Sequence, residues 1–225
     1  SSHLSSRIAR PICPSRPACV CAVHICEAMC RSVVEDMCDN EDTDDFAAAA
    51  AAAAEASATS RQRRVQLVIT PIGPWLPLKR LQAYHSSILI DDFEYSFGIC
   101  GIVVAQGAQS HEYFPRSPAE TQIVDMGTTQ RSAKEMYKKL RPYFRKNSYD
   151  LLRKNCNSFS DCVLCYLSNA RLPKAYRTLE RMGKSADKRS GFVRAISWGQ
   201  YMPNPQADSF LAKSVRSSLL ASPSK

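Results

Sequence analysis

Apolar and polar residues begin to alternate regularly only near residue 65, and the alternation first predicts β-strands. Residues 84–98 are typical of a β-hairpin, because Ile88 and Ile90 alternate on one strand and Phe93, Tyr95 and Phe97 alternate on the return strand. The pair Asp91-Asp92 marks the turn between the two strands. Further short strands are expected over residues 65–69, 100–104 and 121–126, and a loop over residues 107–118.

The second half of the chain has the three-to-four spacing of amphipathic helices. One helix is expected to start at Ser132, since Ser132 and Glu135 fit a capping box, and Pro142 is expected to kink or shorten it. Another follows Cys156, with its apolar face at Phe159, Val163, Leu164, Tyr166 and Leu167. Asn157 or Ser158 is the expected cap of that helix. A short helix over residues 175–182 should stop at Gly183.

Strands that precede helices, with short connections and no βαβ alternation, predict an α+β fold with an antiparallel sheet. Composition and charge divide the chain into three parts. Residues 1–60 have a net charge of −5 and include an eight-alanine run, which is typical of a disordered segment. Residues 61–183 are expected to form the folded domain, and residues 184–225 a basic, serine-rich tail. The region after residue 60 has a net charge of +14.

The N-terminal segment also contains six of the ten cysteines, together with His24. A zinc site there is disfavoured, because no pair of Cys-x-x-Cys knuckles occurs. A disulfide framework is disfavoured as well, since no secretory hydrophobic region accompanies the cysteines. No metal and no cofactor are therefore expected. No stretch reaches the roughly 20 apolar residues that cross a bilayer, so a transmembrane segment is not expected.

Cys156 is the candidate nucleophile, since it stands between two asparagines at an expected strand-to-helix junction. The N-terminus of a helix carries a partial positive charge and unpaired N–H groups. These favour a thiolate and offer donors to a developing oxyanion. The alternative is that Cys156 is a small buried hydrophobic residue, as most of ten cysteines would be.

A nucleophilic cysteine needs a base, and the folded region holds two histidines, His85 and His111. His85 opens the first strand of the predicted hairpin, whereas His111 falls in the predicted loop. Either histidine alone is more often a surface or structural residue than a catalyst.

The hairpin that carries His85 and the segment around Cys156 together resemble the PPPDE family, the DeSI-type cysteine isopeptidases. The resemblance covers about residues 65–183 and includes Leu172-Pro173. Its motifs are His85-Ser86, Glu94-Tyr95-Ser96-Phe97-Gly98, Gly127-Thr128-Thr129 and, most specific, Asn155-Cys156-Asn157-Ser158-Phe159-Ser160. Asp92 stands where family members usually have glycine, and Ser158 where many have histidine.

This resemblance implies a permuted papain-like α+β fold in which His85 and Cys156 form a catalytic dyad. The implied reaction removes a ubiquitin-like modifier, SUMO or ubiquitin, from protein conjugates. Asn155 or Asn157 would add a side-chain donor to an oxyanion hole formed by backbone N–H groups.

Two other functions stay open on the sequence. One is a protein thioesterase (depalmitoylase) with the same dyad, because both reactions pass through an S-acyl enzyme. The other is a non-catalytic module that binds ubiquitin-like proteins. Nucleic acid is not an expected partner, since no recognised binding motif accompanies the basic charge. A cytoplasmic location is expected, which can extend to the nucleus. The sequence does not determine the oligomeric state.

Overall fold

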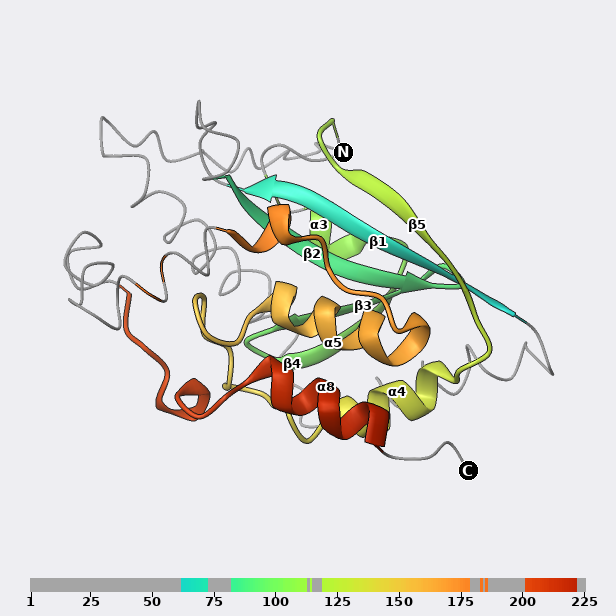
Figure 1. Cartoon of the computed structure of the whole chain (residues 1–225). Helices are drawn as coiled ribbons and strands as arrows, with labels where there is room; N and C mark the ends of the chain where they lie inside the picture. The colour runs from blue at the N-terminus through green and yellow to red at the C-terminus, as the bar shows by residue number, and fades with distance from the viewer. Residues whose placement is uncertain are drawn as a thin grey trace, which may run out of the picture.

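A computed structural model of the chain describes residues 62–72, 82–112, 114, 119–178, 183, 185 and 201–221 (Figure 1). The expectations for residues 1–60, including the cysteines and the alanine run, lie outside these residues. The described part contains one antiparallel sheet in the order β4-β3-β2-β1-β5. Its strands are β1 (Arg63–Ile72), β2 (Ala83–Ile90), β3 (Phe93–Gly98), β4 (Gly101–Gln106) and β5 (Gln122–Thr129). The α+β prediction is confirmed, and each predicted strand is present.

The hairpin turn between β2 and β3 forms without glycine. Asp91 and Asp92 both have positive φ angles, 47° and 69°, which a two-residue hairpin turn requires and which aspartate tolerates better than most residues. The turn is also fastened to β1, because the N–H of Arg64 donates to Asp91 Oδ1 at 2.8 Å. Aspartate at position 92 is thus accommodated in the turn.

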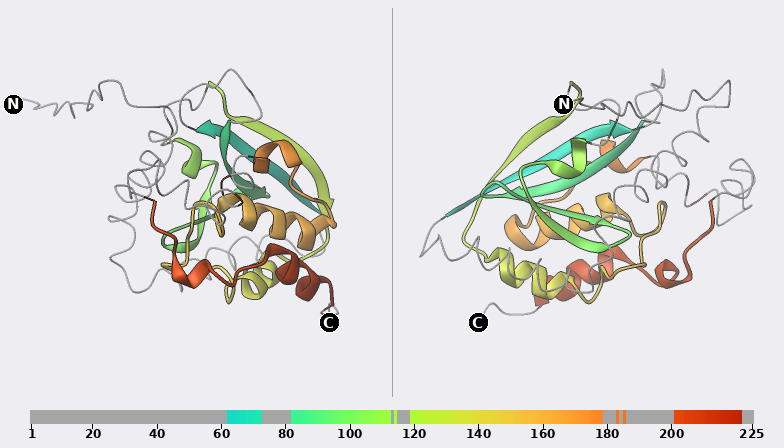
Figure 2. Two further views of the ribbon diagram at one scale, coloured as in Figure 1. Left: turned by 60° about the vertical axis from the view of Figure 1, so that its left-hand side comes forward. Right: turned by 180° about the vertical axis from the view of Figure 1, so that it is seen from behind.

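Helices cover both faces of the sheet (Figures 1 and 2). The long helix α5 (Cys156–Ser168) lies against one face, with α4 (Ala133–Leu140) and α8 (Ala212–Ala221) beyond it, and the short α3 (Gln109–Glu112) lies on the opposite side. Two 3-10 turns, η2 (Lys174–Arg177) and η3 (Pro205–Ala207), complete the described elements. Among these helices, none is long and apolar enough to cross a membrane.

The structure confirms the predicted start of α4 and adds a short helix, α3, that was not predicted. α4 begins as predicted, with Ser132 Oγ accepting from the N–H of Glu135, and it ends two residues before Pro142. Within the loop predicted over residues 107–118, residues 109–112 form α3, whose His111 is 1% exposed, and residues 113 and 115–118 lie outside the described residues. The loop prediction failed there because a single turn of helix around a buried polar residue has no hydrophobic period.

The core lies between the sheet and α5. Apolar side chains from one face of the strands meet one side of the helix. Aromatic rings take part in this contact: Phe144, which follows α4, packs edge-on against Phe97 of β3 and Phe159 of α5, with ring centroids 4.9 and 5.2 Å apart. Such pairs contribute about 0.5–1.5 kcal/mol beyond the area that they bury. The start of α5 is thereby held rigidly against the sheet.

Residues 201–221 are not the tail that the sequence suggested. Phe210, Val215 and Leu219 are buried and belong to the same core as α5. The spacing of these residues does not by itself predict a helix, because serine and basic residues fill the positions between them. α8 therefore completes the domain, and the predicted domain end at residue 183 is corrected.

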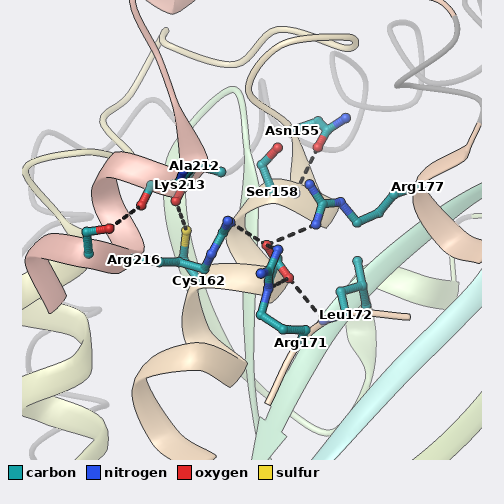
Figure 3. A network of polar contacts seen from close by, with 11 residues as sticks. Asn155, Ser158, Cys162, Arg171, Leu172, Arg177, Ala212, Lys213 and Arg216 are labelled. Atoms are coloured by element: carbon teal, nitrogen blue, oxygen red, sulfur yellow. Dashed lines mark hydrogen bonds and ion pairs between the residues drawn. The ribbon is translucent and has the colours of Figure 1, made fainter. Parts of the chain in front are cut away.

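An ion-pair cluster joins α8 to α5 (Figure 3). The carboxylate of Asp161 is fully buried and receives Arg171, Arg177 and Arg216 from three separate segments, at 2.9, 3.0 and 2.6 Å. The N–H of Leu172 also donates to it, at 3.0 Å. Removing these arginines would leave a buried charge without its partners, which is strongly destabilising.

We expect Leu219→Ala to lower the free energy of unfolding by about 2–4 kcal/mol, since the side chain is 4% exposed in the core. The neighbouring Leu220, 50% exposed on the same helix, is the matched control. Leu220→Ala should change the free energy of unfolding by less than about 0.5 kcal/mol. Urea unfolding of both variants measures the difference. Equal effects would mean that α8 is not packed as described.

Candidate active site

The chain reaches Cys156 through a tight turn, not through the strand that the sequence suggested. Asp150 and Lys154 close the turn with two backbone hydrogen bonds, of 2.8 and 3.0 Å. The carboxylate of Asp150 also accepts from the N–H groups of Leu152 and Arg153, at 2.9 and 2.8 Å. Four hydrogen bonds within five residues favour this turn over an extended strand.

The helix cap also differs from the expectation. Asn155, in extended conformation (φ −127°, ψ −175°), is the N-cap of α5, and its Oδ1 accepts from the N–H of Ser158 at 2.9 Å (Figure 3). Neither Asn157 nor Ser158 serves as the cap, because both already lie inside the helix. Cys156 is consequently the first helical residue, and it is 4% exposed. Its position in the first turn favours a thiolate through the helix dipole.

Asn157 ties the start of α5 to the strand that carries His85. Its side-chain oxygen accepts from Ser86 Oγ at 2.6 Å, and its amide nitrogen donates to the carbonyl oxygen of Tyr84 at 3.0 Å. These are the two residues on either side of His85. Asn157 is 1% exposed, so the bonds form where water does not compete. The backbone at His85 and the start of the Cys156 helix are therefore fixed relative to each other.

The side chain of His85 leaves β2 on the other face of the sheet from Ser86, because successive residues of a strand alternate. Its Nε2 is 2.9 Å from Ser110 Oγ, and its ring lies 4.9 Å from that of Phe114. β2 pairs with β3 only at residues 88–90, so His85 lies beyond this pairing. These contacts are on the α3 side, and the contact between the His85 ring and the Cys156 sulfur stays a prediction.

His111 lies beside His85, with ring centroids 4.6 Å apart, but in a different environment. Its Nδ1 is 2.7 Å from Thr70 Oγ1 and its Nε2 is 2.8 Å from Ser87 Oγ. Burial, together with the nearby His85, lowers the pKa of His111 to about 2. Because both ring nitrogens have hydroxyl partners inside the protein, a structural role fits His111 better than a catalytic one.

The family comparison covers most of these segments. The family model of the PPPDE putative peptidase domain, Peptidase_C97, matches residues 59–196, which include His85 and Cys156. The chain belongs to the PPPDE family. A comparison with curated proteins gave no match.

The C-terminal segment lies beyond the part that the PPPDE model matches, and yet it contacts the turn before Cys156. Tyr201 donates its hydroxyl to the carboxylate of Asp150 at 3.1 Å, and the N–H of Asn204 donates to the same carboxylate at 2.9 Å. The Asn204 amide also donates to the carbonyl oxygens of Asn147 and Tyr149, at 2.8 and 3.0 Å. In this PPPDE member, the turn that leads to the nucleophile is thus braced by residues outside the matched domain.

The two asparagines predicted as oxyanion donors have other contacts. Asn155 donates from its amide nitrogen to the carbonyl oxygen of Leu151 at 2.7 Å, and Asn157 holds β2 as described above. These contacts favour a positioning role for both side chains, and the oxyanion role stays a prediction. At a helix start the first backbone N–H groups have no intrahelical carbonyl to bind, and in α5 the N–H of Ser158 is taken by the Asn155 side chain.

Two residues that contact each other beside His85 were not among the predicted site residues. Glu94, 1% exposed, accepts from both the hydroxyl and the N–H of Ser110, at 2.5 and 2.8 Å. Burial raises the pKa of Glu94, and the Ser110 bonds oppose this shift. The alternation of Phe93, Tyr95 and Phe97 could have placed Glu94 on the face of His85. Nothing in the local sequence marks Ser110.

Burial also acts on the proposed base, because it lowers the pKa of His85 to about 4. At neutral pH the imidazole is therefore uncharged and can accept a proton. As for metals, the described residues contain no group of three or more His, Cys, Asp or Glu side chains that could hold an ion. The chemistry that these side chains can provide is nucleophilic attack with proton transfer.

Proposed function

We propose that this chain is a thiol-dependent isopeptidase that removes SUMO or ubiquitin from protein conjugates through an S-acyl enzyme. The observation that supports it most is the attachment of Asn157 to both neighbours of His85. This attachment links the helix that begins at Cys156 to the strand that carries His85. His85 is uncharged at neutral pH, and the chain belongs to the PPPDE family.

In the first half of the reaction, His85 accepts the thiol proton and the sulfur of Cys156 attacks the carbonyl carbon of the isopeptide bond. The first-turn N–H groups of α5 stabilise the negative charge that forms on the carbonyl oxygen. The C–N bond then breaks, and His85 returns its proton to the lysine amine that leaves. The product is a thioester between Cys156 and the C-terminus of the modifier.

In the second half, His85 takes a proton from water, and the resulting hydroxide attacks the thioester carbonyl carbon. The C–S bond breaks, the thiolate recovers its proton from His85, and the modifier leaves with a free carboxylate. Burial of the site supports both steps, because a water-poor environment strengthens the interaction of the developing oxyanion with the helix N-terminus.

Charge bears on which modifier is bound. Residues 61–225 carry a net charge of +14, and α4 and the residues after it expose Lys134, Lys138, Arg141, Arg145 and Lys146. An acidic partner is drawn to such a surface chiefly through a faster encounter. SUMO-type modifiers are generally more acidic than ubiquitin, so SUMO conjugates are the preferred substrate in this proposal.

We expect cleavage of a SUMO conjugate to exceed that of a ubiquitin conjugate at low salt, and the ratio to fall as salt increases. The reason is that the Debye length shrinks from about 10 Å at 0.1 M to about 3 Å at 1 M. The measurement is kcat/KM for both conjugates across this range. A small uncharged ester substrate, whose rate should hardly vary with salt, serves as the control.

A preference for ubiquitin, or a SUMO preference that salt leaves unchanged, would show that pocket shape sets specificity instead of charge. Cleavage of neither conjugate, with hydrolysis of an S-acyl peptide instead, would contradict the isopeptidase proposal itself.

A further inference from the structure

Ser110 and Glu94 form a hydrogen-bonded chain behind His85. His85 Nε2 lies 2.9 Å from Ser110 Oγ, and Ser110 Oγ lies 2.5 Å from Glu94 Oε1. We infer that Ser110 and Glu94 are positioning residues that hold His85 in the tautomer with its proton on Nε2. The inference deepens the proposed function and rests on it for its catalytic consequence, whereas the tautomer itself is independent of any activity.

The protons available on Ser110 and Glu94 determine which ring nitrogen of His85 is protonated. A serine hydroxyl has one proton and two acceptor sites. Glu94 as a carboxylate can only accept, so Ser110 gives that proton to Oε1 of Glu94, and the other oxygen, Oε2, receives the N–H of the same serine at 2.8 Å. Only the acceptor side of Ser110 Oγ then remains for His85. The nitrogen that faces it must donate, and His85 is therefore protonated on Nε2.

A neutral imidazole with its proton on Nε2 has its lone pair on Nδ1. Nδ1 is the ring nitrogen next to Cγ, so it lies nearer to the β2 backbone than Nε2 does. Asn157 is bonded to both neighbours of His85: to the carbonyl oxygen of Tyr84 and to the hydroxyl of Ser86. The tautomer thus leaves the basic nitrogen close to the β2 backbone, at a position whose two neighbours are bonded to Asn157 of the Cys156 helix.

The hydrogen bonds from His85 to Ser110 and from Ser110 to Glu94 also hold the His85 ring while it is protonated, between the two proton transfers. When His85 carries the proton from Cys156, its Nε2–H continues to donate to Ser110, and Ser110 continues to donate to Glu94. The ring keeps its orientation, so the proton is delivered from Nδ1 to the leaving amine. Glu94 is 1% exposed, and hydrogen bonds in so dry a setting constrain the ring more strongly than exposed ones.

The test is nitrogen-15 NMR of the His85 ring in the full-length protein at neutral pH, with the His85 signals assigned by their loss in His85→Gln. The wild type should show a protonated Nε2 and an unprotonated Nδ1. Ser110→Ala should give a mixture of tautomers. It should also lower kcat on a small acyl substrate roughly 10- to 100-fold, with KM within about twofold, because it disturbs orientation and not binding. Ser110→Thr, which keeps the hydroxyl, should restore both readouts.

Ser132→Ala is the control, since it too removes a serine hydroxyl. That hydroxyl is at the cap of α4, where it accepts the N–H of Glu135. Ser132→Ala should leave the His85 tautomer and kcat unchanged. A wild-type ring protonated on Nδ1, or a Ser110→Ala variant with the wild-type tautomer, would overturn the inference. If the tautomer is as stated and no acyl substrate is hydrolysed, the proposed function fails while the positioning of His85 stands.

Discussion

Replacing Cys156 by alanine is expected to reduce hydrolysis of a modifier conjugate to the background rate. Removal of a covalent nucleophile costs roughly 10⁴-fold or more in kcat, because the remaining groups can only bind and polarise the substrate. The fold should persist, since the substitution removes one sulfur atom from the first position of α5 and leaves the Asn155 cap in place. Steady-state kinetics and circular dichroism measure the two effects.

Cys165 provides the matched control for this substitution. It lies on the same helix, is 3% exposed and is a free thiol. Cys165→Ala removes the same atom from a comparable environment and should leave kcat unchanged. If Cys156→Ala retains full activity, or if Cys165→Ala abolishes it, then Cys156 is not the nucleophile.

Replacing His85 by glutamine is the second large effect that we expect, with kcat lowered roughly 10²- to 10⁴-fold because general acid and base catalysis are lost together. Glutamine has no nitrogen that accepts a proton at neutral pH. Its amide can still donate to Ser110 and thus keep the local packing. Kinetics on a small acyl substrate, with protein shown to be folded, measure the loss.

His111→Gln distinguishes the two histidines. This variant should lower the free energy of unfolding by about 1–3 kcal/mol, because His111 is buried and bonded to Thr70 and Ser87. Its kcat per folded molecule should stay within about tenfold of the wild type, since no proton passes through it. A larger loss of kcat in His111→Gln than in His85→Gln would reverse the assignment of the base.

The parts of the fold that depend on local pattern were predictable from the sequence. Alternation placed β2 and β3, and the Asp91-Asp92 pair placed their turn. Ser132 placed the start of α4 through its cap. In these segments the side chain that decides the structure acts on its own neighbours, so a short window of sequence contains the whole interaction.

The parts that depend on distant partners were not predictable in this way. α8 is buried through Leu219 and through Arg216, which binds Asp161 on another helix. Its own sequence of serines and basic residues resembles a solvated tail. Ser110 likewise has meaning only beside Glu94 and His85, which precede it by 16 and 25 positions. Contacts of this kind leave no period in the sequence.

The central claim is that the sulfur of Cys156 is the nucleophile that attacks the C-terminal carbonyl of a modifier. The most direct measurement treats the full chain with SUMO or ubiquitin that carries a C-terminal electrophile, and then maps the adduct by peptide mass spectrometry. We expect a single adduct on Cys156 that does not form in Cys156→Ala. An adduct on another cysteine, or no adduct with either modifier, would contradict it.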